Sequence, residues 1–247
     1  MTDTPSIDFL PGHGGAQIAV HRLGAGRPVV MLHGLASSAQ MNWIRYGAAR
    51  RIADAGFEAI MIDQRVHGQS AVPQGEDDYP PDMEAVIPAL GLGAFDLIGY
   101  SMGSRLSVKL IERGLAPERL ILGGMGLEGL TNWAPRRDHF LRLLDRFDSA
   151  ERGDPDFLAI SFMRSMKVDP VALRRLLLSM TDIARESVAL VKMPTLVLCG
   201  DRDDDNGSAD ALAVALPDGQ RGTIPGNHMS CITFPSFGEA MADYLAA

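Results

Sequence analysis

Short apolar runs that alternate with helical stretches constrain the fold of this chain most strongly. Near-continuous apolar strands joined by helices are typical of a parallel sheet that is covered on both faces. The runs expected to form such strands are 28–32, 58–62, 95–99, 120–124, 195–200 and 221–224. Two earlier runs, 7–10 and 17–22, flank a glycine-rich turn and predict an antiparallel hairpin. The sequence therefore predicts an α/β fold with a mostly parallel, eight-stranded sheet.

The helices are expected between these strands. The predicted core helices are 41–55, 82–90, 102–113, 208–215 and about 235–245. Between 126 and 192 the strand pattern stops and helical patterns take over. Asp154-Pro155 and Asp169-Pro170 each pair an N-cap residue with a first-turn proline, which predicts two helix starts there. We expect residues 1–247 to form one domain, in which 126–192 is a helical cap inserted between core strands.

Net charge, apolar runs and cysteine count indicate which partners and which cellular compartment to expect. The 247 residues carry a net charge of −8, which disfavours a nucleic acid or an anionic membrane as a partner. No run approaches the roughly 18 consecutive apolar residues of a membrane span. The first five residues lack the features of a leader peptide, and Cys199 and Cys231 are too few for a disulfide framework. The sequence thus predicts a soluble, cytoplasmic protein.

The five residues 99–103, Gly-Tyr-Ser-Met-Gly, carry the strongest chemical signal. They follow the apolar run 95–98 directly and precede a helical stretch. Small residues at both ends of such a pentapeptide allow a sharp turn from strand to helix, which lifts the serine hydroxyl clear of the backbone. The first amides of the helix then point at the same place. Ser101 is therefore the candidate nucleophile for attack on a carbonyl carbon.

A serine nucleophile needs a base, and six histidines compete for that role. His228 follows the predicted strand 221–224 across a Pro-Gly-Asn turn, so it lies at the edge of the sheet where parallel sheets place their sites. The other histidines are expected to be structural or on the surface: His13, His21, His33, His67 and His139. His228 is the candidate base.

The acid that would orient this base is expected in the loop 200–207. That loop contains Asp201, Asp203, Asp204 and Asp205, and composition does not choose among them. A run of aspartates also suggests calcium, but the remaining spacing of a calcium loop is missing. No His, Cys, Asp and Glu set has tight ligand spacing, so no metal site is expected.

The whole pattern resembles the α/β-hydrolase superfamily over essentially the full chain, with the order Ser, Asp, His. In that family the acid is usually the Asp of a Gly-x-x-Asp after this strand, which implies Asp203. Asp205 or Asn206 would then cap the next helix. Some members place the acid after the preceding strand, which here would be Glu128.

Two further motifs fit the resemblance. His33-Gly34-Leu35 is similar to the family's oxyanion loop, which implies the backbone N–H groups of Leu35 and Met102 as oxyanion donors. The segment 63–70 resembles a structural turn of the family, in which Val66 here replaces the usual glycine. The local backbone of that turn is therefore expected to differ.

A glycine pattern at 124–129 matches the dinucleotide-binding fingerprint after a strand. A long helix cannot start smoothly there because Asn132 and Pro135 follow closely. The acids about 20 residues on, Asp145 and Asp148, fall in a predicted helix rather than at a strand end. A nucleotide site is therefore not expected, and no cofactor is implied.

The resemblance implies a serine hydrolase that acts on a small-molecule ester or lactone through an acyl-enzyme. No Arg or Lys pair stands beside the strand-to-helix elbow at 99–103, and methionines are frequent in the cap, so a small, largely apolar substrate is expected. The candidate substrate-binding residues are Trp43, Met125, Trp133, Phe162, Met163, Met166 and Met229. The alternatives are a carbon–carbon bond hydrolase of diketone type and a non-catalytic, ligand-binding protein of the same fold.

Overall fold

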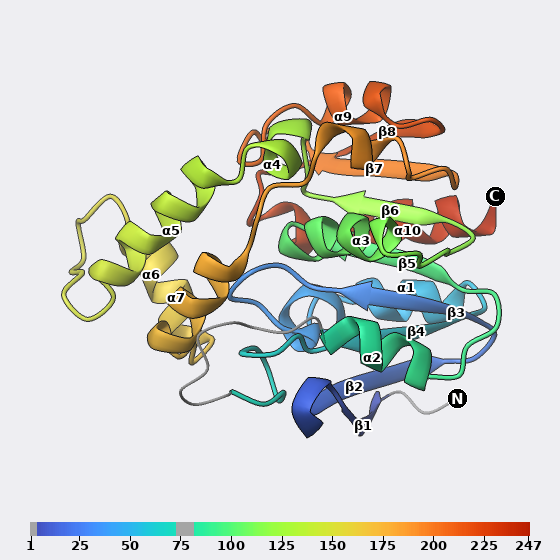
Figure 1. The fold of residues 1–247 in the computed structure, drawn as a ribbon, viewed down its shortest axis with the longest axis horizontal. Coiled ribbons are helices and arrows are strands. Elements are labelled where there is room, and N and C mark those ends of the chain that lie inside the picture. The colour runs from blue at the N-terminus through green and yellow to red at the C-terminus, as the bar shows by residue number, and fades with distance from the viewer. Residues whose placement is uncertain (1–3, 73–81) are drawn as a thin grey trace.

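The computed structural model describes residues 4–72 and 82–247 (Figure 1). Residues 1–3, on which the argument about a leader peptide partly rests, lie outside the described chain. The strands form one eight-stranded sheet in the order β1-β2-β4-β3-β5-β6-β7-β8. Strand β2 pairs antiparallel with β1 and β4, and every pairing from β4 to β8 is parallel. The predicted α/β fold, with its antiparallel N-terminal hairpin, is confirmed.

The strand bounds lie within two residues of the predicted ones, because most of the strands are apolar runs with clear turn residues at their ends. The strands are β1 Ser6–Pro11, β2 Gln17–Gly24, β3 Arg27–Leu32, β4 Phe57–Ile62, β5 Asp96–Tyr100, β6 Leu120–Gly123, β7 Thr195–Gly200 and β8 Gly219–Ile224.

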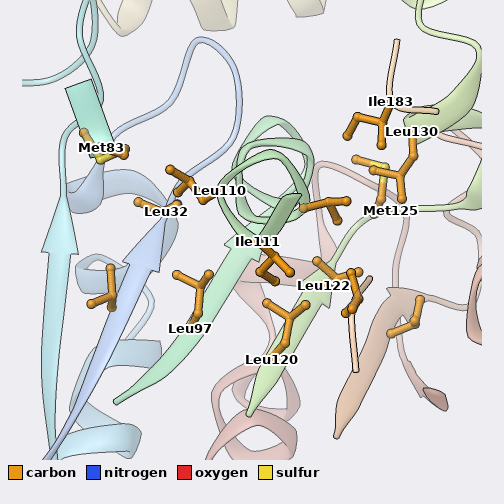
Figure 2. Close-up of a cluster of buried hydrophobic side chains, with 14 of the residues drawn as sticks. Leu32, Met83, Leu97, Leu110, Ile111, Leu120, Leu122, Met125, Leu130 and Ile183 are labelled. Atoms are coloured by element: carbon orange, nitrogen blue, oxygen red, sulfur yellow. The ribbon is translucent and has the colours of Figure 1, made fainter. Parts of the chain in front are cut away.

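Helices cover both faces of the sheet (Figure 1). The helices α1 (Ala48–Asp54) and α10 (Pro235–Ala246) lie on one face, and α2 (Asp82–Ala89), α3 (Met102–Glu112) and α9 (Ala209–Ala215) lie on the other. Successive side chains of a strand point to opposite faces of the sheet, so each strand contributes to the cores on both faces. In β5, Leu97 belongs to the hydrophobic cluster on the α3 side (Figure 2), whereas Ile98 belongs to the cluster under α1 and α10.

The prediction of one continuous helix over 41–55 is wrong. A short π-helix, Gln40–Ile44, comes first, and α1 begins only at Ala48. Gly47 separates them with a φ of 80°, a left-handed conformation that glycine adopts without steric cost. Trp43 lies in the π-helix and is fully buried against Phe237, with the two ring centroids 5.9 Å apart.

Five helices lie between β6 and β7, and α5 to α7 extend beyond the sheet (Figure 1). They are α4 Leu127–Thr131, α5 Ala134–Asp145, α6 Phe157–Ser165, α7 Pro170–Ser179 and α8 Arg185–Val188. Asp169 caps α7 as predicted, because its carboxylate accepts the N–H groups of Val171 and Ala172. The other predicted start is wrong: Asp154 precedes α6 by a turn, and its carboxylate pairs with Arg146 at 2.6 Å.

The described residues include neither a candidate membrane span nor a candidate metal site. Within residues 4–72 and 82–247, none of the helices has the length and apolar character that crossing a bilayer requires. The same residues bring together no group of three or more His, Cys, Asp or Glu side chains that could hold a metal ion.

Candidate active site

The turn between β5 and α3 holds Ser101 in a conformation that few residues other than glycine adopt. Its φ is 52° and its ψ is −111°. The flanking glycines allow this turn: a Cβ atom on Gly99 would collide with the carbonyl group of Gly103, and one on Gly103 would collide with the carbonyl oxygen of Leu32. Helix α3 therefore packs directly on the sheet, with its first turn beside the serine.

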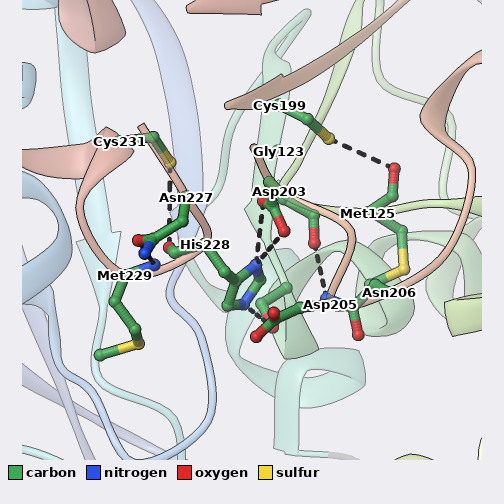
Figure 3. Close-up of polar contacts among 12 residues, drawn as sticks. Gly123, Met125, Cys199, Asp203, Asp205, Asn206, Asn227, His228, Met229 and Cys231 are labelled. Atoms are coloured by element: carbon green, nitrogen blue, oxygen red, sulfur yellow. Dashed lines mark hydrogen bonds and ion pairs between the residues drawn. The ribbon is translucent and has the colours of Figure 1, made fainter. Parts of the chain in front are cut away.

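The structure brings Ser101, His228 and Asp203 together from three separate loops. The His228 Nε2 atom lies 3.0 Å from Ser101 Oγ, and its Nδ1 atom lies 3.0 and 3.1 Å from the two Asp203 carboxylate oxygens. Figure 3 shows the contacts between the His228 ring and Asp203. Asp203 and His228 are buried, with 8% and 7% of their surfaces exposed. The geometry permits proton transfer from the serine hydroxyl to an imidazole that the carboxylate holds in one tautomer.

The neighbouring acids have other partners. The Glu128 carboxylate accepts the backbone N–H of Ser208 at 2.8 Å, and Asp201 accepts that of Gly226 at 2.8 Å. Asp205 forms an ion pair with Arg136 at 2.7 Å. Among these carboxylates, only that of Asp203 contacts His228 in the described chain.

The predicted N-cap of α9 is wrong. Ser208 caps this helix, because its hydroxyl accepts the N–H of Ala211 at 3.0 Å. Asn206 instead donates its side-chain amide to the carbonyl oxygen of Gly124 at 2.8 Å, which ties the loop that carries Asp203 to the end of β6.

Tyr100 positions the loop that carries His228. Its hydroxyl donates to the backbone carbonyl oxygen of His228 and lies 3.1 Å from Cys231 Sγ. Its ring also stacks on the His228 imidazole, with 5.2 Å between the centroids. Burial raises the pKa of Tyr100 well above its ordinary value, so the hydroxyl remains a donor.

We expect Tyr100→Phe to destabilise this loop. The substitution keeps the stacked ring but leaves the His228 carbonyl oxygen with only the weak Cys231 thiol donor, at 3.8 Å, which costs about 1 to 3 kcal/mol. The urea midpoint should fall, and kcat should fall more than KM changes. Tyr244→Phe is the matched control, because the Tyr244 hydroxyl is buried without a hydrogen-bond partner in the described chain. An equal effect of both substitutions would argue against a role for the Tyr100 hydroxyl.

The predicted oxyanion loop lies beside Ser101. Leu35 and Met102 line one cavity together with Ser101. The residues around Leu35 are held in place: the N–H of Gly34 donates to the Asn42 side chain at 3.1 Å, and the N–H of Ala36 donates to His67 Nε2 at 3.0 Å. The loop is therefore fixed on both sides of the Leu35 amide.

His33 and His67 are buried and neutral. His33 Nε2 accepts the N–H of Gln64 at 3.0 Å and His67 Nε2 accepts that of Ala36, so neither atom carries a proton. Burial lowers the pKa of both groups, that of His67 to about 3. Nearby, Val66 adopts a φ of 75°, a left-handed conformation that glycine reaches far more easily than a β-branched residue.

These histidines predict a loss of stability in acid. The unfolded chain takes up a proton at each histidine as the pH falls below about 6.5, whereas folded His67 does so only near pH 3. Stability should therefore decrease as the pH falls from about 6.5 toward 3 and should change little from this source above pH 7. Urea midpoints at pH 7 and pH 5 test this. In His67→Gln, whose side-chain oxygen can accept the Ala36 N–H, the decrease should be smaller, and an unchanged decrease would contradict the assignment.

The cavity beside Ser101 contains two of the seven candidate substrate-binding residues, Met125 and Trp133. Trp43 is in the hydrophobic core, and Met163 is in the core of the cap. Met229 is half exposed, and its side chain points away from the Asp203–His228 pair (Figure 3). Phe162 and Met166 are partly buried in the cap and do not line the cavity. These five residues line neither the cavity at Ser101 nor the larger cavity beside it.

The cavity walls also contain residues that the sequence did not suggest: Arg105, Arg136, Phe140 and Asn206. The expectation that no basic pair lies near the elbow is therefore wrong. Arg105 could have been found from spacing, because residues four apart lie on one face of a helix and Arg105 follows Ser101 by four. Arg136 comes from the cap, and its position depends on tertiary packing.

Comparison with known proteins identifies the family. The family described as alpha/beta hydrolase fold matches residues 27–147. The AB hydrolase superfamily protein YisY of Bacillus subtilis is 30% identical over 212 residues, which cover 74% of this chain and 77% of that protein. The chain belongs to the α/β-hydrolase family. Family membership indicates a hydrolase.

Two other proteins are similar over different lengths. The 2-hydroxy-6-oxo-2,4-heptadienoate hydrolase of Pseudomonas putida is 27% identical over 150 residues, or 54% of this chain and 53% of that protein. An esterase from Exiguobacterium antarcticum superposes with a TM-score of 0.80 at 22% identity and covers 97% of this chain and 99% of its own. The structural similarity shows that the fold is shared.

Proposed function

We propose that this α/β-hydrolase cleaves a carboxylic ester or lactone of a small, largely apolar substrate through an acyl-enzyme on Ser101. The observation that supports the proposal most strongly is the continuous chain of contacts from Asp203 through His228 to Ser101, with 3.0 Å between His228 Nε2 and Ser101 Oγ. This chain ends at a serine on a strained turn, where its hydroxyl faces a cavity.

In the proposed mechanism, Ser101 Oγ attacks the carbonyl carbon of the substrate while His228 Nε2 takes the hydroxyl proton. Asp203 stabilises the imidazolium ion that forms. The backbone N–H groups of Leu35 and Met102 donate to the oxyanion of the tetrahedral intermediate. His228 then gives its proton to the leaving alkoxide, and a water molecule attacks the acyl-enzyme by the same steps to release the acid.

The walls of the cavity favour a small acyl group. The space at Ser101 is about 10 Å³, and a neighbouring cavity of about 230 Å³ shares Met102 and Arg105 with it. A space near 10 Å³ holds about one water molecule, so a longer substrate must extend toward the larger cavity. Leu35, Met125 and Phe140 supply apolar surface next to the serine.

A substrate panel tests the proposal. Purified protein should hydrolyse 4-nitrophenyl esters or small lactones with saturable kinetics, and Ser101→Ala protein should not. Each methylene that becomes buried contributes up to about 0.8 kcal/mol, or about fourfold in kcat/KM, until the cavity is full. Tight binding of such compounds without turnover by the wild type would favour the non-catalytic alternative.

A carbon–carbon bond hydrolase of diketone type is the second candidate. The observation that favours this candidate is the 27% sequence identity to the Pseudomonas putida hydrolase over 150 residues. A 2-hydroxy-6-oxo-dienoate belongs in the same panel for this reason. A higher kcat/KM for this compound than for every ester and lactone would select the second candidate.

A further inference from the structure

Arg105 is a buried cation next to the candidate nucleophile. It lies one helical turn after Ser101 on α3, and its backbone N–H donates to the Ser101 carbonyl oxygen at 3.2 Å. Only 4% of its surface is exposed. Its side chain lines the cavity at Ser101 and also the larger cavity beside it. Arg105 therefore lies between the reacting atoms and the space into which a substrate can extend.

The hydrogen bonds of Arg105 leave its charge without a carboxylate partner. Its Nη1 atom donates to the carbonyl oxygens of Gly129 and Leu130, and its Nη2 atom donates to that of Thr181 at 2.7 Å. Within the described chain, its Nε atom is buried and has no acceptor. Asp182 is the nearest acidic influence: its charge raises the pKa of Arg105, but the two side chains form no ion pair, and the Asp182 carboxylate accepts the backbone N–H of Trp133 at 2.6 Å.

The other cationic side chains in the two cavity walls all form ion pairs, unlike Arg105. Arg136 pairs with Asp205, Arg65 with Asp82, Lys109 with Glu112 and Arg113 with Glu84. Burial lowers the pKa of Arg105 to about 10 although the Asp182 charge opposes this shift, so Arg105 is still charged near neutral pH. A buried cation without a direct ion-pair partner is costly, and an anion that pairs with it recovers much of that cost.

Trp133 supplies a second donor at the same place. The Arg105 guanidinium lies over its ring, 4.7 Å from the centroid. Trp133 is 4% exposed and lines the cavity at Ser101, and its Nε1 atom is buried without an acceptor in the described chain. Arginine and the indole N–H can donate but not accept hydrogen bonds. The two stacked side chains beside the cavity therefore hold two unused donors and a positive charge that forms no ion pair.

We propose that Arg105 and Trp133 bind a carboxylate of the substrate, so that the preferred substrates are half-esters of short dicarboxylic acids or lactones that carry a carboxylate. This inference rests on the proposed function for the position of the scissile carbonyl group. A carboxylate is the planar, acceptor-only group that a guanidinium recognises best. Because Arg105 is one turn from Ser101, the carboxylate lies a few carbon atoms from the carbonyl carbon, and the remainder of the substrate is apolar.

Binding to protein that cannot turn over tests the inference separately from catalysis. In Ser101→Ala protein, calorimetry should show that monobenzyl succinate binds at least about tenfold more tightly than benzyl levulinate, its neutral counterpart, as expected for a charged hydrogen bond. Adding Arg105→Gln should reduce this preference to about one. Adding Trp133→Phe, which keeps the ring and removes the N–H, should reduce it about threefold or more. Equal affinity for the two compounds would overturn the inference.

A matched control separates this effect from a general change in charge. Arg174 carries a positive charge on α7, pairs with Asp145 and lies in neither cavity wall. Arg174→Gln should leave the preference unchanged. If Arg105→Gln protein does not fold, the Trp133→Phe variant decides, and an unchanged preference in it overturns the inference.

Turnover distinguishes failure of the carboxylate site from failure of the proposed function. In wild-type protein, 4-nitrophenyl succinate should be hydrolysed with a higher kcat/KM than 4-nitrophenyl levulinate, and Arg105→Gln should raise KM for the succinate selectively. Binding preference without turnover of any ester would contradict the proposed function and leave the carboxylate site standing. Turnover of both esters at equal kcat/KM would contradict the carboxylate site alone.

Discussion

Replacement of Ser101 by alanine is expected to lower kcat by about four to six orders of magnitude, as in other hydrolases whose catalytic serine and histidine act as a unit. The hydroxyl is the group from which His228 Nε2, 3.0 Å away, can take a proton. Alanine keeps the Cβ atom, so the strained turn and the packing of α3 on the sheet should remain. Steady-state and single-turnover kinetics on the best ester measure the loss.

The control for this substitution is Ser165→Ala. Ser165 is exposed on the cap, and its hydroxyl donates only to the carbonyl oxygen of Phe162 one turn earlier. Its removal should change kcat less than twofold, within the usual effect of surface substitutions. Retention of more than about one hundredth of the activity in Ser101→Ala would contradict the assignment of the nucleophile.

Asp203→Asn should lower kcat by about four orders of magnitude with little change in KM. The Asp203 carboxylate accepts from His228 Nδ1 and so keeps Nε2 free to take the proton from Ser101. An asparagine amide can donate to Nδ1 instead, which places the ring proton on Nε2, where it blocks that step. The pH profile of kcat, measured beside the near-ultraviolet circular dichroism of the variant, separates this effect from misfolding.

Neighbouring acids provide matched controls for Asp203. Asp204→Asn changes an exposed carboxylate in the same loop and should leave kcat nearly unchanged. Glu128→Gln should also be tolerated, because a glutamine oxygen can still accept the Ser208 N–H. A large loss in Glu128→Gln, together with near-normal activity in Asp203→Asn, would move the acid to the loop after β6.

The sheet was predictable because each buried strand is a short apolar run bounded by turn residues. The turn at Ser101 was predictable for a similar reason: glycines at 99 and 103 are the residues that let α3 pack against the sheet. The break in the helix 41–55 was missed because a single glycine in a helical pattern is compatible with a continuous helix. Gly47 interrupts this helix through its positive φ, which only the structure shows.

The substrate-binding residues were less predictable. An apolar pattern at helical spacing indicates that a cap helix buries one face. It does not indicate whether that face packs in the core of the cap or lines the cavity. Met163 is an example of the first kind and Trp133 of the second. The spacing of Arg105 from Ser101 indicates that it lies near the nucleophile, but not that its guanidinium is buried without an ion-pair partner. Whether a buried donor has an acceptor depends on tertiary packing.

Reaction with a fluorophosphonate tests the central claim, that Ser101 is an activated nucleophile, most directly. Such reagents phosphonylate a serine whose hydroxyl proton is taken by a neighbouring base. Intact-protein mass spectrometry should show one adduct per chain, and peptide mapping should place it on Ser101. No adduct should form in Ser101→Ala, and Asp203→Asn should slow the reaction strongly. An adduct that persists in Ser101→Ala, or a wild-type protein that does not react, would contradict the account.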